Sequence, residues 1–159
     1  MSDTKQMQAQ RVYKSIINML DSRDWKYERH DEDLLIKSGI KGEDLPIEFI
    51  LFVDAERELI RLLSKLPFSI PEDKRVDAAV AVCAANNCMI NGCFDFDMND
   101  GDLSFRLVSS YKSGSVLSDD LLEYMILVSA STIDKYNDKF FMLGKGMLTA
   151  EQFLKQEGN

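Results

Sequence analysis

The chain has 159 residues, of which 45% are apolar and 29% charged, the balance of an ordinary globular protein rather than a disordered or fibrous one. This length suits a single domain, expected to span residues 1–159 with a core over about 4–143 and a C-terminal extension over 144–159. The formal net charge is -8. An acidic surface repels phosphate backbones and anionic lipids, which argues against nucleic-acid and membrane partners and leaves protein partners open.

Charged residues are scattered through the first 25 positions, so no uncharged stretch resembles a secretory signal. No apolar run approaches the roughly 20 residues that cross a bilayer. We therefore expect a cytoplasmic protein. Cys83, Cys88 and Cys93 are an odd set spaced five apart, unlike a zinc knuckle or a disulfide framework, and are predicted to be buried or incidental thiols.

The first half of the chain predicts one helix followed by a strand meander. Apolar residues recur at helical spacing from Thr4 to about Ser22. Short apolar runs separated by acidic or Gly/Pro turns then predict antiparallel strands over Tyr27–His30, Leu34–Ile40, Pro46–Val53 and Glu58–Leu66.

A second helix is predicted between Ser69 and Gly92. Ser69 and Glu72 have the spacing of a capping box, and Pro71 is tolerated at an early helical position. Small apolar residues would let the helix lie close to a sheet. The stripe predicted to face the sheet comprises Val76, Ala79, Val80, Cys83 and Ala84.

A long last helix is predicted to begin near Ser118 and to stop at the glycines 144 and 146. A short terminal helix over Thr149–Lys155, with a frayed polar end, follows. The residues of the long helix that recur at core spacing are Leu122, Met125, Ile126, Ile133, Tyr136 and Phe140.

Between the two long helices lies an acidic hairpin in which apolar and polar residues alternate, beginning at Phe94 and returning through Leu103. A four-residue loop over residues 99–102 would place Asp95 directly opposite Arg106. We predict that this exposed ion pair contributes about 0.2–1 kcal/mol and helps to fix the register.

The same hairpin has a calcium interpretation, because Asp95, Asp97 and Asn99 match the first oxygen-ligand positions of an EF-hand loop. However, the glycine stands at Gly101, one position late, and Arg106 replaces the bidentate glutamate. The flanking segments also have strand periodicity. The sequence therefore predicts a turn and no metal site.

Candidates for catalysis are few. His30 is the only histidine and lies in a charged strand beside an acidic turn, which favours a solvated side chain over a catalytic base. Gly144 to Gly146 lacks the spacing of a phosphate loop. We expect no catalytic residue and no cofactor, so the chain is predicted not to be an enzyme; a carboxylate-based enzyme is the remote alternative.

The strands from Pro46 to Leu66 are apolar on both faces, whereas a strand pair with one wet face alternates cleanly. Something should therefore cover the second face: a helix of the same chain, or a second subunit or client segment. A homodimer would be the commonest closed assembly. The candidate interaction surface comprises Ile50, Phe52, Leu59 and Leu63.

An ordered set of residues along Trp25 to Leu143 carries a family resemblance. It comprises Leu66-Pro67 and Ile70-Pro71, Asn87, Gly92, Phe94, Asp100-Gly101, Arg106, Leu117-Ser118, Asp134 and Tyr136. In this set the chain resembles the bacterial YbjN family, whose fold is similar to that of type III secretion chaperones. The resemblance implies an α+β fold with helices against an antiparallel sheet, no catalytic residues and no cofactor.

Two functions follow as expectations. The first is a non-enzymatic, chaperone-like protein that binds a polypeptide, or its own copy, through apolar strand surface with an acidic rim. The second is a regulatory module in a bacterial sensory or stress response that acts through a protein partner without touching DNA.

Overall fold

The computed structural model describes residues 3–112 and 117–158. Its helices are α1 (Asp3–Ser22), α2 (Arg75–Asn87), α3 (Asp119–Gly144) and α4 (Ala150–Glu157), and a short 3-10 turn, η1 (Glu72–Lys74), precedes α2. Its strands are β1 (Tyr27–His30), β2 (Leu35–Lys41), β3 (Pro46–Asp54), β4 (Leu59–Ser69), β5 (Cys93–Phe96) and β6 (Asp102–Ser110). They form one six-stranded antiparallel sheet in the order β1-β2-β3-β4-β6-β5, which confirms the predicted α+β fold.

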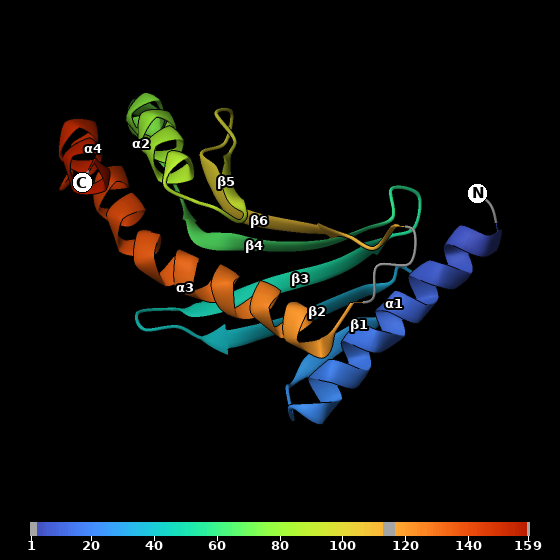
Figure 1. Cartoon of the computed structure of the whole chain (residues 1–159). Coiled ribbons are helices and arrows are strands. Elements are labelled where there is room, and N and C mark those ends of the chain that lie inside the picture. Colours follow the sequence, from blue (N-terminus) through green and yellow to red (C-terminus); the bar gives the residue numbers. More distant parts are fainter. Residues whose placement is uncertain (1–2, 113–116, 159) are drawn as a thin grey trace.

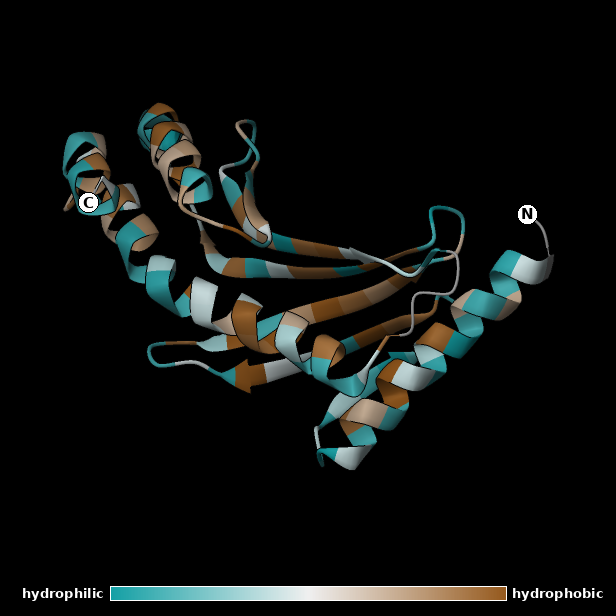
Figure 2. Cartoon of the chain, viewed as in Figure 1, coloured by the Kyte–Doolittle hydropathy of each residue, from teal (hydrophilic) through white to brown (hydrophobic). Residues whose placement is uncertain are grey.

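The helices pack against one side of this sheet, which we call the inner face; the opposite side is the outer face. Helix α3 crosses the inner face, α1 lies toward the β1 end, and α2 and α4 lie together at the β5 end (Figure 1). Apolar segments follow β3 and β4 along their length (Figure 2). Among the described helices, none lies on the outer face.

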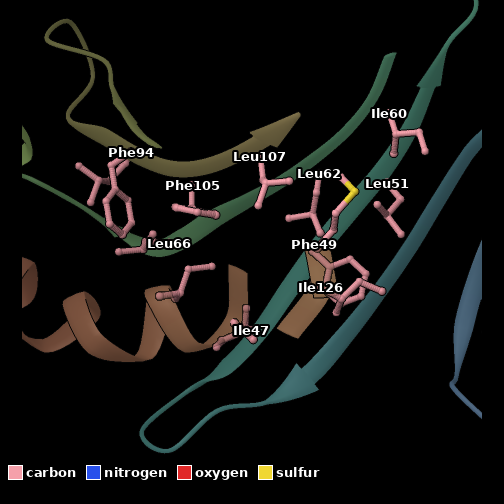
Figure 3. Packing of buried hydrophobic residues seen from close by; sticks show 14 of the residues in the cluster. Ile47, Phe49, Leu51, Ile60, Leu62, Leu66, Phe94, Phe105, Leu107 and Ile126 are labelled. Carbon is pink, nitrogen blue, oxygen red and sulfur yellow. The ribbon is translucent and has the colours of Figure 1, made fainter. Parts of the chain in front are cut away.

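The core fills the space between α3 and the inner face. Alternate residues of the central strands point into it, as Figure 3 shows for Phe49, Leu62 and Phe105, and Ile126 of α3 meets them. Every residue of the long helix that was predicted to face inward is buried: Leu122, Met125, Ile126, Ile133, Tyr136 and Phe140.

The core also includes α4, beyond the expected boundary near residue 143. Phe153 is fully buried and stacks on Phe140 with ring centroids 5.4 Å apart. Phe94 of β5 meets Phe140 edge-to-face at 5.0 Å, so three elements share one aromatic cluster. A capping box of Thr149 and Gln152 starts α4.

Glu157 at the end of α4 is held rather than frayed. Its side chain is only 5% exposed, accepts a 2.7 Å hydrogen bond from the Tyr136 hydroxyl and pairs with Lys139. Burial opposes its charge, but the hydrogen bonds from Lys139 and Tyr136 outweigh that effect and lower the pKa of the carboxyl. Burial, with the Glu157 contact, raises the pKa of Tyr136.

Helix α2 differs from its prediction in two respects. The stripe expected to face the sheet is largely exposed, with Val76 at 69% and Val80 at 41%, and Cys83 also faces out. The capping box is absent, because the Ser69 hydroxyl lies in β4 and donates a 2.7 Å hydrogen bond to Asp102. The buried positions are Ala78, Ala81, Val82 and Ala85.

The acidic hairpin has the predicted faces but another register. Phe94 pairs with Phe105, and Cys93, not Asp95, stands opposite Arg106. The connecting loop is longer than predicted and is closed by Gly101, which has a φ of +81°. Asp95 and Arg106 still share a face, so the predicted ion pair forms diagonally, at 2.7 Å from Nε to Oδ2 and 3.0 Å from Nη2 to Oδ1.

Candidate protein-binding surface

The outer face holds the four residues predicted to form an interaction surface. Ile50 of β3 stands opposite Leu63 of β4, Phe52 of β3 lies one pleat further along, and Leu59 follows on β4. Each of these side chains is half-buried. Strand pairing therefore gathers all four on one surface, away from the helices.

Two further apolar residues extend this surface. Leu35 of β2 stands opposite Phe52, and Val108 of β6 stands opposite Arg61 of β4. The sequence indicated that these strands exist, but only the pairing register shows that Leu35 and Val108 join the patch. We call the set Leu35, Ile50, Phe52, Leu59, Leu63 and Val108 the outer apolar patch.

A shallow groove of about 820 Å³ borders the patch. Ile50 and Leu63 line it, together with charged residues on both sides such as Lys37 and Lys65. Gly39 of β2 contributes no side chain to its wall. The groove leaves room for side chains of a docked segment beside the apolar residues.

The charges around the outer apolar patch are mixed rather than acidic, which corrects the expected acidic rim. Basic side chains from three strands, Lys37, Arg61 and Arg106, project on the outer face. Arg106 is paired with Asp95, and Lys65 pairs with Asp102. The acidic excess of the chain is therefore not concentrated on this face.

One edge of the sheet is occupied by a side chain that the sequence did not single out. Asn86 of α2 donates from Nδ2 to the carbonyl oxygen of Phe94 at 3.0 Å, and its Oδ1 accepts the Phe94 N–H at 2.8 Å. The amide thus satisfies both groups of Phe94 that point away from β6. Asn87, the residue cited for the family resemblance, is exposed. No periodicity distinguishes these two asparagines.

Candidate catalytic groups lie apart from one another. His30 is on β1 with Nε2 2.8 Å from Glu28 Oε1, whereas Cys93 is on β5 at the opposite edge of the sheet. Burial raises the pKa of the Cys93 thiol, which opposes thiolate formation. All three cysteines are free, and Cys83 and Cys88 are exposed rather than buried.

The carboxylates of the hairpin accept hydrogen bonds within its own turn. Asp97 Oδ1 accepts the backbone N–H of Asn99 at 2.8 Å, and Asp100 Oδ1 accepts that of Asp102 at the same distance. Across residues 3–112 and 117–158, no three His, Cys, Asp or Glu side chains are grouped to hold a metal ion.

Most of the chain that forms the sheet, its covering helices and the hairpin matches the model of a known protein family. The family model of YbjN, described as "Putative bacterial sensory transduction regulator", matches residues 13–142. The chain belongs to the YbjN family. The model thus spans most of this YbjN-family chain, from within α1 to near the end of α3. No curated protein sequence matches it.

Solved structures share this fold. The structure described as "YbjN, a putative transcription regulator from E. coli" has a TM-score of 0.60 at 11% identity, covering 80% of this YbjN-family chain and 92% of its own. A chain of the ExsC-ExsE complex has a TM-score of 0.55 at 13% identity, covering 79% and 90%. A chain of the HopA1-SchA chaperone-effector complex has 0.52 at 14%, covering 81% and 94%. The type III secretion chaperone-like fold is therefore confirmed.

In the part of the YbjN-family chain that the structure describes, no helix is both long and apolar enough to span a bilayer.

Proposed function

We propose that this YbjN-family chain is a non-enzymatic, cytoplasmic protein-interaction protein that binds a polypeptide through its outer face. The observation that carries the proposal is the outer apolar patch, which runs across neighbouring strands on the side away from every described helix. Contiguous apolar surface of this kind marks interaction sites in soluble proteins.

The comparisons support the same class of function. Two solved structures with this fold come from complexes of a protein with a protein partner, one of them a chaperone with its effector. The matched family is described as a sensory transduction regulator. This favours a second candidate function, a regulatory module in a bacterial sensory or stress response that acts through the same surface.

The test is capture of a polypeptide from the native cytoplasm at moderate salt by tagged wild-type protein and by variants of the outer face. Phe52→Asp places a charge in the outer apolar patch. Val76→Asp is the matched control, because Val76 is an exposed apolar residue on α2. Circular dichroism and thermal unfolding establish that each variant is folded.

A polypeptide captured by wild type and by Val76→Asp, and lost from folded Phe52→Asp, supports the proposal. Equal capture by all three proteins would place binding elsewhere. Sedimentation of the same samples shows whether the patch joins two copies, since a homodimer through this face would dissociate in Phe52→Asp alone.

A further inference from the structure

Arg61 lies in the middle of the outer apolar patch. Its neighbours across the ladder are Phe52 on β3 and Val108 on β6. Along β4 the residues on the same face, two positions away on either side, are Leu59 and Leu63. A cationic side chain thus stands among four apolar ones, and it is half-buried there.

Among the described residues Arg61 has no anionic partner, unlike Arg57, Lys65 and Arg106; Lys37 has none either, but it is exposed, whereas Arg61 is half-buried. Arg106 is held by Asp95, Lys65 by Asp102, and Arg57 by Asp54 at 3.1 Å. Within the described ranges, no carboxylate reaches the Arg61 guanidinium. A partner that covered the patch with apolar side chains alone would strip water from an unpaired charge, which strongly disfavours binding.

The partner must therefore bring an acceptor to Arg61. A carboxylate suits best, because it can accept two parallel hydrogen bonds from the planar guanidinium. Two acidic side chains on this face are already engaged: Asp54, diagonal to Arg61 across the β3–β4 pair, by Arg57, and Asp95 by Arg106. A second copy of the chain would bring another unpaired arginine to the same surface.

The secondary structure of the partner follows from the backbone. An extended segment pairs its backbone at a sheet edge; laid across a face, it would leave N–H and C=O groups without partners. A helix satisfies these groups internally and presents a stripe of side chains instead. The β5 edge is already engaged by Asn86, and the β1 edge, Tyr27–His30, lies three strands away from Arg61 on β4.

We infer that the outer face binds an acidic amphipathic helix of another protein, with a Glu or Asp inside its apolar stripe that pairs with Arg61. This inference rests on the proposed function and specifies the chemistry of its partner. The carboxylate selects among apolar helices, because a helix with a neutral or basic residue at that position leaves the guanidinium unpaired.

The probes are two fluorescent helical peptides of about 18 residues, long enough to hold helical structure. Both carry the same leucine stripe, and a single position inside it is Glu in one and Lys in the other. Binding is measured by anisotropy for wild type, Arg61→Glu and Phe52→Asp. The matched control is Lys14→Glu, which makes the same charge change at an exposed position of α1.

Wild type and Lys14→Glu should bind the Glu peptide about 10-fold more tightly than the Lys peptide, and Arg61→Glu should reverse that order. Equal binding of both peptides by wild type, with loss of both in Phe52→Asp, overturns the acidic partner while retaining the proposed function. If wild type binds neither peptide, the inference of an acidic helical partner is also overturned. A wild-type dimer in sedimentation that Arg61→Glu dissociates would identify a second copy as the occupant instead.

Discussion

The side-chain amide of Asn86 forms a two-way hydrogen bond with the backbone of Phe94, at 3.0 Å and 2.8 Å. A helix side chain thereby takes the place of a further strand at the β5 edge. We expect Asn86→Ala to lower the free energy of unfolding by about 1–2 kcal/mol, because it leaves the Phe94 groups unpaired. Urea denaturation measures the change.

Asn87→Ala is the control, since Asn87 is exposed one residue away. It should change stability by less than about 0.5 kcal/mol. Similar losses of stability in both variants would mean that asparagine stabilises helix α2 itself, rather than acting through the contact with Phe94.

Gly101 lies where the turn of the acidic hairpin packs against the backbone at the end of β4. It has a φ of +81°, and a Cβ there would lie 2.1 Å from the carbonyl oxygen of Ile70. We expect Gly101→Ala to cost more than about 3 kcal/mol, because the clash adds to left-handed backbone strain. Thermal unfolding measures the loss.

Gly146→Ala isolates the strain alone, because Gly146 has a φ of +71° but its nearest contact is Lys74 Cε at 3.6 Å. A cost of about 1 kcal/mol is expected there. If Gly101→Ala were no worse than this control, the contact with Ile70 would not constrain the hairpin.

The Glu157 carboxyl gives α4 a pH-dependent attachment. Its folded pKa is lowered below the ordinary value of about 4.3, so its stabilisation is present at neutral pH and is lost as pH falls through the folded pKa. Glu157→Gln should cost about 1–3 kcal/mol at pH 7 and nothing once the wild-type carboxyl is protonated. Denaturation at a series of pH values tests this.

Glu151→Gln serves as the matched variant, since Glu151 is an exposed residue of α4 paired with exposed Lys155. Its effect should stay within about 0.5 kcal/mol throughout. A Glu157→Gln penalty that persisted unchanged into acid would point to lost packing instead of lost charge.

The Asp95–Arg106 pair is suited to a double-mutant cycle with alanine at each position. Both side chains are partly exposed, so the coupling energy should be about 0.2–1 kcal/mol and should shrink in high salt. A coupling above about 2 kcal/mol, or one insensitive to salt, would contradict the assignment as a screened surface pair.

The sequence predicted the inner face of α3 correctly because large apolar residues such as Ile126, Ile133 and Phe140 contrast sharply with the charged residues between them. Helix α2 lacks that contrast. Alanine, valine and cysteine are present on every side of it, so periodicity favoured Val80 when packing buries Val82.

The hairpin shows a similar limit. Alternation fixes which face each residue occupies, and a shift of two residues preserves that alternation. The Asp95–Arg106 pair therefore forms despite the wrong register. The length of the loop sets the register of the hairpin. The carbonyl oxygen of Asp97 accepts the Gly101 N–H at 2.9 Å, and Gly101 in turn contacts the backbone of Ile70. No local sequence pattern encodes this tertiary contact.

For the candidate site, the order of apolar residues along Pro46 to Leu66 predicted two apolar faces. In the structure, no described helix covers the second face. Arg61 could not be singled out beforehand. Its significance depends on Val108, which is 47 positions further along the chain and becomes its neighbour only through the β4–β6 pairing.

The unequal edges of the sheet also limit how copies of the chain could polymerise. Asn86 and α2 cap the β5 side, while β1 on the other side offers only Tyr27–His30. Filaments need two open edges on every molecule, so that each addition exposes a new one. Joining at β1 would consume the available edge of both molecules, and growth would end at a pair instead of continuing into a fibre.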